Sequence, residues 1–212
     1  MMIEEQPTVF VVDDDLSVRE SLGLLLNSAG YSVRTYTLAQ EFLASEHSGK
    51  GPTCLILDVE MPGLSGLELQ EELSSKDYAI PIIFITGHGD IPMSVRAMKK
   101  GAVEFLPKPF DDSDLLAAVD EAIQKDSQTR TDQEERRHIR QRLDLLTPRE
   151  YEILTYLITG ILNKQIAYSL NIAERTVKAH RKKVMEKIGV ESIAELVRLT
   201  EKAGVRPADV SI

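Results

Sequence analysis

Acidic side chains stand where two apolar stretches of the N-terminal half end. Three Asp residues at positions 13–15 directly follow residues 8–12, and Asp58 directly follows residues 54–57. Carboxylates that lie close together repel each other and resist ionisation. A hard divalent cation with oxygen ligands, such as Mg²⁺ or Mn²⁺, relieves that repulsion. If the two stretches are neighbouring strands, the sequence therefore predicts a metal site where they end.

Two further side chains of the N-terminal half are suited to handling phosphate. Thr86 follows apolar residues 82–85, and Lys108 follows the short stretch 104–106. A hydroxyl and an ammonium can contact a phosphoryl group attached to Asp58, which would then be a nucleophile forming an aspartyl phosphate. The metal ion and Lys108 would neutralise charge on the transferred group. Each residue alone indicates little, but four suitable types at four strand ends indicate one phosphoryl-transfer site.

The elements that must position these residues alternate between strand and helix. Short apolar, β-rich runs predict strands, and helical spacing of apolar residues between them predicts helices. The expected strands are residues 8–12, 32–36, 54–57, 82–85 and 104–106, and the expected helices are residues 17–29, 38–44, 67–73, 93–100 and 113–124. Such repeats predict a doubly wound α/β fold: a five-stranded parallel sheet with helices on both faces. Ligands of these sheets bind beyond the carboxyl ends of the strands, where the four predicted site residues lie.

Four segments of this half resemble the receiver domain of two-component response regulators, a flavodoxin-like fold. They read VVDD (11–14), LDVEMPG (57–63), ITG (85–87) and LPKPF (106–110). The resemblance covers about residues 7–125, and residues 88–93 (HGDIPM) look most like the FixJ subgroup. It implies that a sensor histidine kinase phosphorylates Asp58. It also implies that Asp13 and Asp14 hold Mg²⁺ together with Asp58 and the backbone carbonyl of Glu60.

The same resemblance implies how phosphorylation changes the receiver surface. In the family, the residues matching Thr86 and Phe105 form a switch: Thr86 moves toward the phosphoryl oxygen and Phe105 turns inward. The Lys108–Pro109 bond is expected to be cis, in keeping with the rule that cis bonds precede proline. Phosphorylated members commonly form homodimers through the fourth and fifth helices and the fifth strand.

The second half is predicted to be all-helical. Thr147, Pro148 and Glu150 combine an N-cap, a proline at the first helical position and a capping box, so a helix runs from there to Thr159. Three further helices are expected over residues 164–170, 174–188 and 192–203. The polar residues 126–138 favour a helix continuing from the receiver. We therefore expect a receiver at 1–124, a polar, helical linker at 125–144 and a small four-helix domain at 145–212.

Two of these helices form a helix-turn-helix pattern around the turn at residues 171–173. The second of them, residues 174–188, carries six cations, and Val177, Val184 and Ile188 have the spacing of its buried face. Lys178, Arg181 and Lys182 are then expected to point outward together. That disposition suits a recognition helix in the major groove of DNA.

Three segments here resemble the LuxR-type DNA-binding domain: LTPRE (146–150), NKQIA (163–167) and RTVKAH (175–180). The resemblance spans about residues 146–203. By matching position it implies that Lys178, Ala179 and Lys182 face base edges, and that Lys164, Thr176 and Lys183 face phosphates. Promoter DNA is then a partner, RNA polymerase is a further one, and the fourth helix can pair two copies. Ala173 stands where the family often has Ser, which as a poor N-cap costs the helix about 1 kcal/mol.

Composition and charge are consistent with this division. Residues 1–124 carry 8 Lys/Arg against 21 Asp/Glu, a net charge of −13, whereas residues 145–212 carry 11 against 8, or +3. An acidic front and a basic back indicate two domains with different partners. The single Cys54 allows no intrachain disulfide, and neither a zinc-like Cys/His cluster nor an apolar run of membrane-spanning length is present. These features favour the cytoplasm and no membrane partner.

Two other classes of function remain open at this point. Asp13-x-Asp15 after a strand also resembles the nucleophile motif of haloacid-dehalogenase-type phosphatases, although that family does not require Asp58 and its later catalytic Asp pair is missing here. Alternatively, the second half could be a helical module that binds protein; its partner interaction would be insensitive to salt, whereas DNA affinity falls steeply with salt. A phosphorylation-controlled transcription regulator, not an enzyme, accounts for both halves of the chain.

Overall fold

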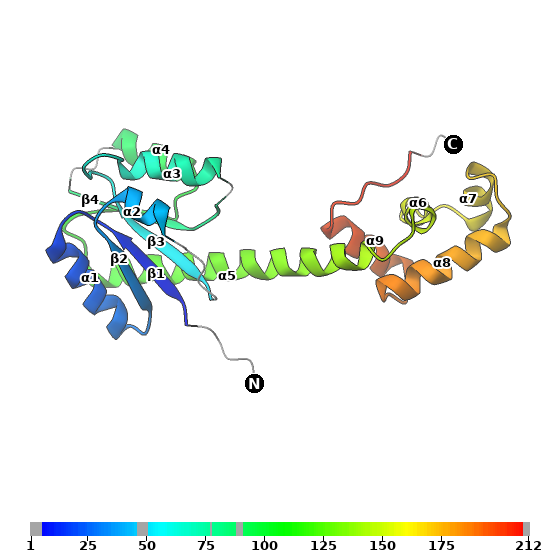
Figure 1. The fold of residues 1–212 in the computed structure, drawn as a ribbon, viewed down its shortest axis with the longest axis horizontal. Coiled ribbons are helices and arrows are strands. Elements are labelled where there is room, and N and C mark those ends of the chain that lie inside the picture. Colours follow the sequence, from blue (N-terminus) through cyan, green and yellow to red (C-terminus); the bar gives the residue numbers. More distant parts are fainter. Residues whose placement is uncertain (1–5, 46–50, 77, 88–90, 210–212) are drawn as a thin grey trace. The chain divides into compact units, whose positions relative to one another are not determined.

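The computed structural model describes residues 6–45, 51–76, 78–87 and 91–209 (Figure 1). The chain divides into two compact units, Met1–Arg130 and Thr131–Ile212. Each unit has its own hydrophobic core. Within the described residues, no helix is long and apolar enough to cross a membrane.

The first unit is built on a five-stranded parallel sheet in the order β2-β1-β3-β4-β5. Its strands are β1 (Thr8–Val12), β2 (Ser32–Tyr36), β3 (Thr53–Asp58), β4 (Ile82–Thr86) and β5 (Glu104–Pro107). All five predicted strands are confirmed. β1, β3 and β4 are almost wholly buried, because helices cover the sheet on both sides.

Five helices cover the two faces of this sheet (Figure 1). They are α1 (Leu16–Ser28), α2 (Ala39–Ala44), α3 (Gly66–Ser75), α4 (Ile91–Lys99) and α5 (Asp112–Leu143). α1 and α5 pack on one face, where Leu26 and Val119 meet alternate residues of the central strands. α2, α3 and α4 pack on the other face around Phe42 and Phe84. The predicted doubly wound architecture is therefore confirmed.

The strand register brings the predicted chemistry to one edge. In β3, Asp58 is the last residue and lies beside Ile85 of β4. Val12, the residue before Asp13, lies beside Leu57. Because all strands are parallel, their carboxyl ends meet at the same edge of the sheet.

A buried carboxylate fastens α5 to the opposite edge of the sheet. Asp126 accepts hydrogen bonds from the backbone N–H of Thr53, at 2.7 Å, and from Nε of Arg130, at 2.6 Å. Thr53 opens β3, the strand that Asp58 closes. Asp126 and Arg130, which the sequence assigns to the linker, thus pack against the sheet.

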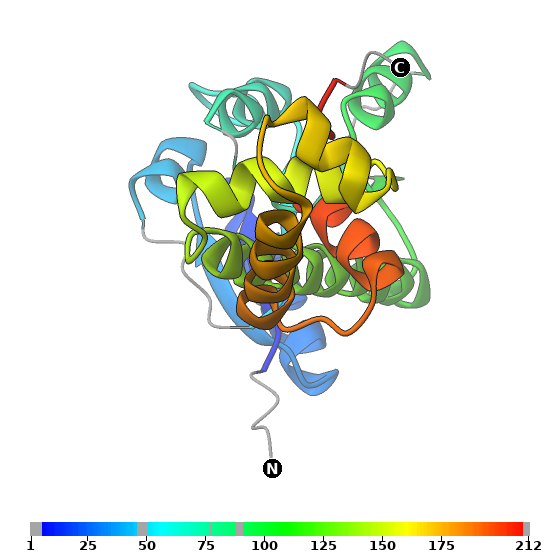
Figure 2. The same ribbon diagram turned by 90° about the vertical axis from the view of Figure 1, so that its right-hand side faces the viewer.

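The second unit contains α6 (Pro148–Leu157), α7 (Asn163–Ser169), α8 (Glu174–Ile188) and α9 (Ile193–Lys202), drawn in yellow to red in Figure 2. α6 begins with the predicted capping box of Thr147 and Glu150. The core of the unit also includes Ile139 and Leu143, from the last turns of α5. The predicted all-helical second half is confirmed, and the segment expected to be a polar linker supplies two core residues.

Candidate functional site

Lys108 joins two carboxylates at the carboxyl edge of the first sheet. Its Nζ lies 2.7 Å from Oδ2 of Asp13 and 2.8 Å from Oδ1 of Asp58. Asp13 is fully buried, and Asp58 is 4% exposed. Thr86, the last residue of β4, is fully buried, and its carbonyl accepts from the Lys108 N–H at 2.7 Å. The structure thus gathers residues from the ends of β1, β3, β4 and β5, as the sequence predicts.

Burial, hydrogen bonds and neighbouring charges shift the pKa values of Asp58 and Lys108. Burial raises the pKa of the Asp58 carboxyl above its ordinary value; the Lys108 hydrogen bond opposes this effect, and the charge of Asp13 adds to it. Burial tends to lower the pKa of Lys108, but the hydrogen bonds and charges of Asp13 and Asp58 outweigh that and raise it. Lys108 therefore stays cationic beside two carboxylates that would otherwise repel each other.

Local hydrogen bonds fix the loop after β1. The carbonyl of Asp13 accepts from Nη1 of Arg19 at 2.6 Å, and its Oδ1 accepts from the Asp15 N–H at 2.9 Å. Asp15 in turn caps α1 by accepting from the Ser17 N–H at 2.7 Å. The sequence gives Arg19 no role, because an Arg one turn into an amphipathic helix is usually a solvated side chain.

Gly66 is a second positioning residue that sequence reasoning missed. A Cβ built on Gly66 would lie 2.3 Å from the carbonyl oxygen of Asp58, a distance that real Cβ atoms do not reach. The Gly66 N–H also donates to the Val59 carbonyl at 3.0 Å. Only glycine allows α3 to begin so close to the end of β3. The signal in the sequence was a glycine directly after an N-cap Ser, where a side chain is normally tolerated.

The donors around Asp58 fit a hard divalent cation. Asp13 and Asp58 are oxygen donors close enough to share one ammonium, and the Glu60 N–H donates to the Asp58 carboxylate. Asp14 and Glu60 both line an open depression beside these residues. Within the described chain, no three His, Cys, Asp or Glu side chains converge as a ready metal site. The carboxylates therefore suit Mg²⁺ or Mn²⁺ in chemistry, and Lys108 supplies the cation between Asp13 and Asp58 in this structure.

The residues expected to form a switch lie on β4 and β5. Phe105 is half-buried, and its ring centroid is 6.2 Å from that of Phe84, with the ring planes tilted by 43°. Its side chain packs on the face that α4 covers. The Lys108–Pro109 bond is cis, which confirms that expectation. His88, the first residue of the FixJ-like stretch 88–93, lies outside the described residues.

The outer side of α8 carries most of the residues predicted to meet DNA. Val177, Val184 and Ile188 are fully buried, which confirms the expected core face. The predicted contact residues that are exposed are Lys164 on α7 and Lys178, Ala179, Lys182 and Lys183 on α8. Thr176 is half-buried. Ala173 provides no side-chain cap to α8, as expected from its alanine methyl.

Arg181 does not point outward with Lys178 and Lys182 as expected. It is half-buried, and its Nη1 donates to Oδ1 of Asn163 at 3.3 Å. The reason is its place on the helix: Arg181 is four residues after Val177, so it lies at the flank of the buried face. This cation links α8 to α7.

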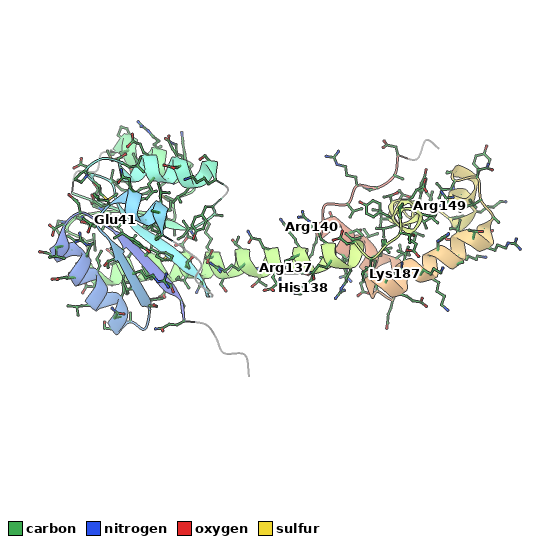
Figure 3. All side chains as sticks on the ribbon, viewed as in Figure 1. Glu41, Arg137, His138, Arg140, Arg149 and Lys187 are labelled. Atoms are coloured by element: carbon green, nitrogen blue, oxygen red, sulfur yellow. The ribbon has the colours of Figure 1, made fainter. Side chains whose placement is uncertain are left out.

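Lys187, labelled in Figure 3, is a second cation of α8, and its partners lie within the second unit. Its Nζ lies 2.6 Å from Oε2 of buried Glu150 and 3.0 Å from the carbonyl oxygen of Leu145. The hydrogen bond from Lys187, followed by that from the Thr147 N–H, lowers the pKa of Glu150 to about 2. Glu150 thus closes the capping box of α6 and anchors the end of α8 at the same time.

This ion pair makes the stability of the second unit depend on pH. A carboxylate with a lowered pKa contributes stability that is complete above its ordinary value of 4.5 and is lost as the pH falls toward about 2. Glu150→Gln should be less stable than the parent at neutral pH, and the difference should shrink as the pH falls through that window. Urea unfolding of both proteins across pH 2–7 measures the difference between their free energies of unfolding. The other carboxylates are the same in both proteins, so their contributions cancel in this difference.

Glu152→Gln is the control, because it removes an exposed carboxylate of the same helix. Its free energy of unfolding should differ little from that of the parent at every pH. A difference for Glu150→Gln that stays constant with pH would contradict the prediction.

Comparisons with known proteins identify both units. The family model described as the response regulator receiver domain matches residues 9–120. The model described as bacterial regulatory proteins, luxR family, matches residues 144–200.

Related proteins match along nearly the whole chain. Nodulation protein W of Bradyrhizobium diazoefficiens is 48% identical over 93% of this chain and 86% of that protein. Transcriptional regulatory protein FixJ of Azorhizobium caulinodans is 44% identical over 97% of each. Among solved structures, the response regulator StyR is 52% identical, with a TM-score of 0.82 over 93% of this chain and 99% of that one. Full-length FixJ from B. japonicum is 41% identical, with a TM-score of 0.56 over 93% and 97%.

Proposed function

Because this chain belongs to the response regulators that join a receiver domain to a LuxR-type DNA-binding domain, we propose that it regulates transcription when a sensor histidine kinase phosphorylates Asp58. The observation that carries the proposal is the buried Asp58 carboxylate beside Asp13 and the ammonium of Lys108. We assign residues 1–124 to the receiver, 125–144 to a helical linker and 145–212 to DNA binding.

The chemistry at Asp58 is a phosphoryl transfer. An oxygen of Asp58 attacks phosphorus in the phosphohistidine of the kinase, the new O–P bond forms, and the N–P bond breaks with its electron pair returning to the imidazole. Lys108 turns from Asp58 to a phosphoryl oxygen, and the Thr86 hydroxyl donates to another. Asp13, Asp14, Asp58 and the Glu60 carbonyl would hold Mg²⁺ or Mn²⁺, which when bound supplies positive charge for the phosphoryl oxygens.

Phosphorylation is then transmitted through the β4–β5 face. Thr86 moves toward the phosphoryl group, and Phe105, already half-buried against Phe84, turns inward. This change favours a homodimer through α4, β5 and α5. A local charge change that biases two arrangements of one surface is a general mechanism of such switches.

The dimer binds promoter DNA through α8. Lys178, Ala179 and Lys182 face base edges, and Lys164, Thr176 and Lys183 face phosphates. Arg181 and Lys187 hold α8 in place through Asn163 and Glu150. RNA polymerase is a further partner once the protein is bound at a promoter.

Membership of this family supports one of the classes of function considered for this sequence over the others. Its members are transcriptional regulators and not classical enzymes, and the luxR match favours DNA over a protein ligand for the second unit. We propose that covalent chemistry is limited to self-phosphorylation at Asp58 from a phosphodonor and slow self-dephosphorylation, and that the protein acts in the cytoplasm.

A mobility-shift experiment with a library of genomic fragments tests this function. The chain is assayed with and without Mg²⁺ and acetyl phosphate, a small phosphodonor. A discrete set of fragments should be shifted to slower-migrating complexes at much lower protein concentrations with both additives than with either alone. Phosphorylation without any change in DNA binding would contradict the proposed link between the two units.

A further inference from the structure

Two glutamates flank two of the three exposed lysines of α8. Glu174, Lys178, Lys182 and Glu186 follow one another at intervals of four residues, so each step advances only about 40° around the helix. They form a single stripe on the outer side of α8, which we call the acid–base ladder. It spans about 18 Å, enough to run along the part of a helix that enters a major groove.

Each lysine of the ladder is paired with one glutamate. Lys178 Nζ lies 2.9 Å from Oε1 of Glu174, and Lys182 Nζ lies 3.7 Å from Oε1 of Glu186. The tighter pair has its glutamate on the N-terminal side, the more favourable order in a helix. Both pairs thus place a negative charge beside a cation that is proposed to read DNA.

These pairs contribute little to the fold. Exposed fractions of the four side chains run from 45% to 79%, and exposed pairs of this kind add little stability because water screens them. The core of α8 is instead secured by Val177, Val184 and Ile188, and its end by Lys187. Glu174 lies in the first turn of α8, where a carboxylate favours the helix dipole, whereas Glu186 lies near the end of the helix, where it does not. Both glutamates also act on lysines that are proposed to face DNA.

Their main effect falls on electrostatic binding. Affinity for arbitrary DNA comes almost wholly from cations that neutralise phosphates and release counterions. A glutamate beside a lysine competes with the phosphates for that lysine and is itself repelled by them. Binding at a preferred site suffers less, because hydrogen bonds to base edges add to the electrostatic term.

We propose that Glu174 and Glu186 are specificity-determining residues that suppress binding of α8 to arbitrary DNA. This inference rests on the proposed DNA-binding function. The glutamates hold Lys178 and Lys182 until base edges offer them better partners. Their removal therefore strengthens binding to all DNA while weakening the preference for the right sequence.

Fluorescence anisotropy with the full, acetyl phosphate-treated chain tests the proposal. The two probes are a random-sequence duplex and the duplex most enriched when the parent chain selects from a random pool. The variants are Glu174→Gln, Glu186→Gln and the double variant, and Kd is measured at several KCl concentrations. Glu152→Gln is the matched control, because it breaks a similar exposed pair, with Arg149 at 2.5 Å, on α6.

Each single variant should bind the random duplex about three- to tenfold more tightly, with a salt dependence steeper by up to about one ion. Binding to the selected duplex should strengthen less. The ratio of the Kd for the random duplex to the Kd for the selected duplex therefore falls, and it falls furthest in the double variant. An unchanged ratio and salt slope, or a ratio that rises, would overturn this inference alone. A parent chain that selects no duplex would overturn the proposed DNA-binding function as well.

Discussion

Asp58→Asn abolishes the response of DNA binding to a phosphodonor, while the unphosphorylated protein keeps its fold. An amide has no anionic oxygen to attack phosphorus, so no phosphoryl group is attached. The amide oxygen can still accept the hydrogen bond that Lys108 Nζ makes with Asp58 Oδ1 at 2.8 Å. Intact mass after acetyl phosphate treatment measures attachment, and the mobility shift with and without acetyl phosphate measures the response. Both should show no change on treatment.

Asp111→Asn is the control for this experiment. Asp111 is an exposed aspartate of the same unit, after the Lys108 loop. This variant should gain mass and bind DNA on treatment as the parent chain does. A phosphodonor response that persists undiminished in Asp58→Asn would place the phosphorylation site elsewhere.

Lys178→Ala should weaken binding to the selected duplex by about 1–3 kcal/mol, or roughly five- to 150-fold in Kd. The Lys178 side chain is 64% exposed, and it pairs with Glu174 of its own helix, so truncation leaves the core unchanged. Kd values for the selected duplex and for its single-base variants measure the effect. The loss should concentrate at one base pair, where the parent chain discriminates and the variant does not.

Lys76→Ala is the matched control, because Lys76 also pairs with a glutamate four residues earlier, Glu72, at 2.8 Å. It lies in the receiver unit, so binding should be unchanged. If Lys178→Ala instead weakens binding equally on every sequence, Lys178 contacts a phosphate and does not read a base.

The residues that meet at the carboxyl edge of the first sheet could be predicted from the sequence, because one simple rule places them there. Parallel strands end at a common edge, so apolar runs followed by Asp13, Asp58, Thr86 and Lys108 were enough to bring these residues together. The hydrogen bonds of Lys108 to both carboxylates are consistent with that prediction. The helices were also predictable, since capping and periodicity are local signals.

Contacts between distant segments could not be predicted in this way. The hydrogen bond from Thr53 to Asp126 joins residues 73 positions apart, and the clash that requires Gly66 depends on where the Asp58 carbonyl points. Charge counting also overstated the DNA-facing surface of α8. Arg181 was expected to point outward toward DNA, but it donates to Asn163, and Lys187, another of the six cations counted on this helix, pairs with Glu150.

On α8, the residues that hold the helix in place are separate from the exposed residues that are proposed to face DNA, and this separation has an evolutionary consequence. Residues that hold the helix in place occupy its inner face and its end, whereas the four side chains of the acid–base ladder are exposed and pair with one another. Mutations on the ladder can therefore change which promoters are read with little loss of folding free energy. After gene duplication, two copies of this domain can acquire separate sets of target genes through a few surface substitutions, without compensating changes in the core.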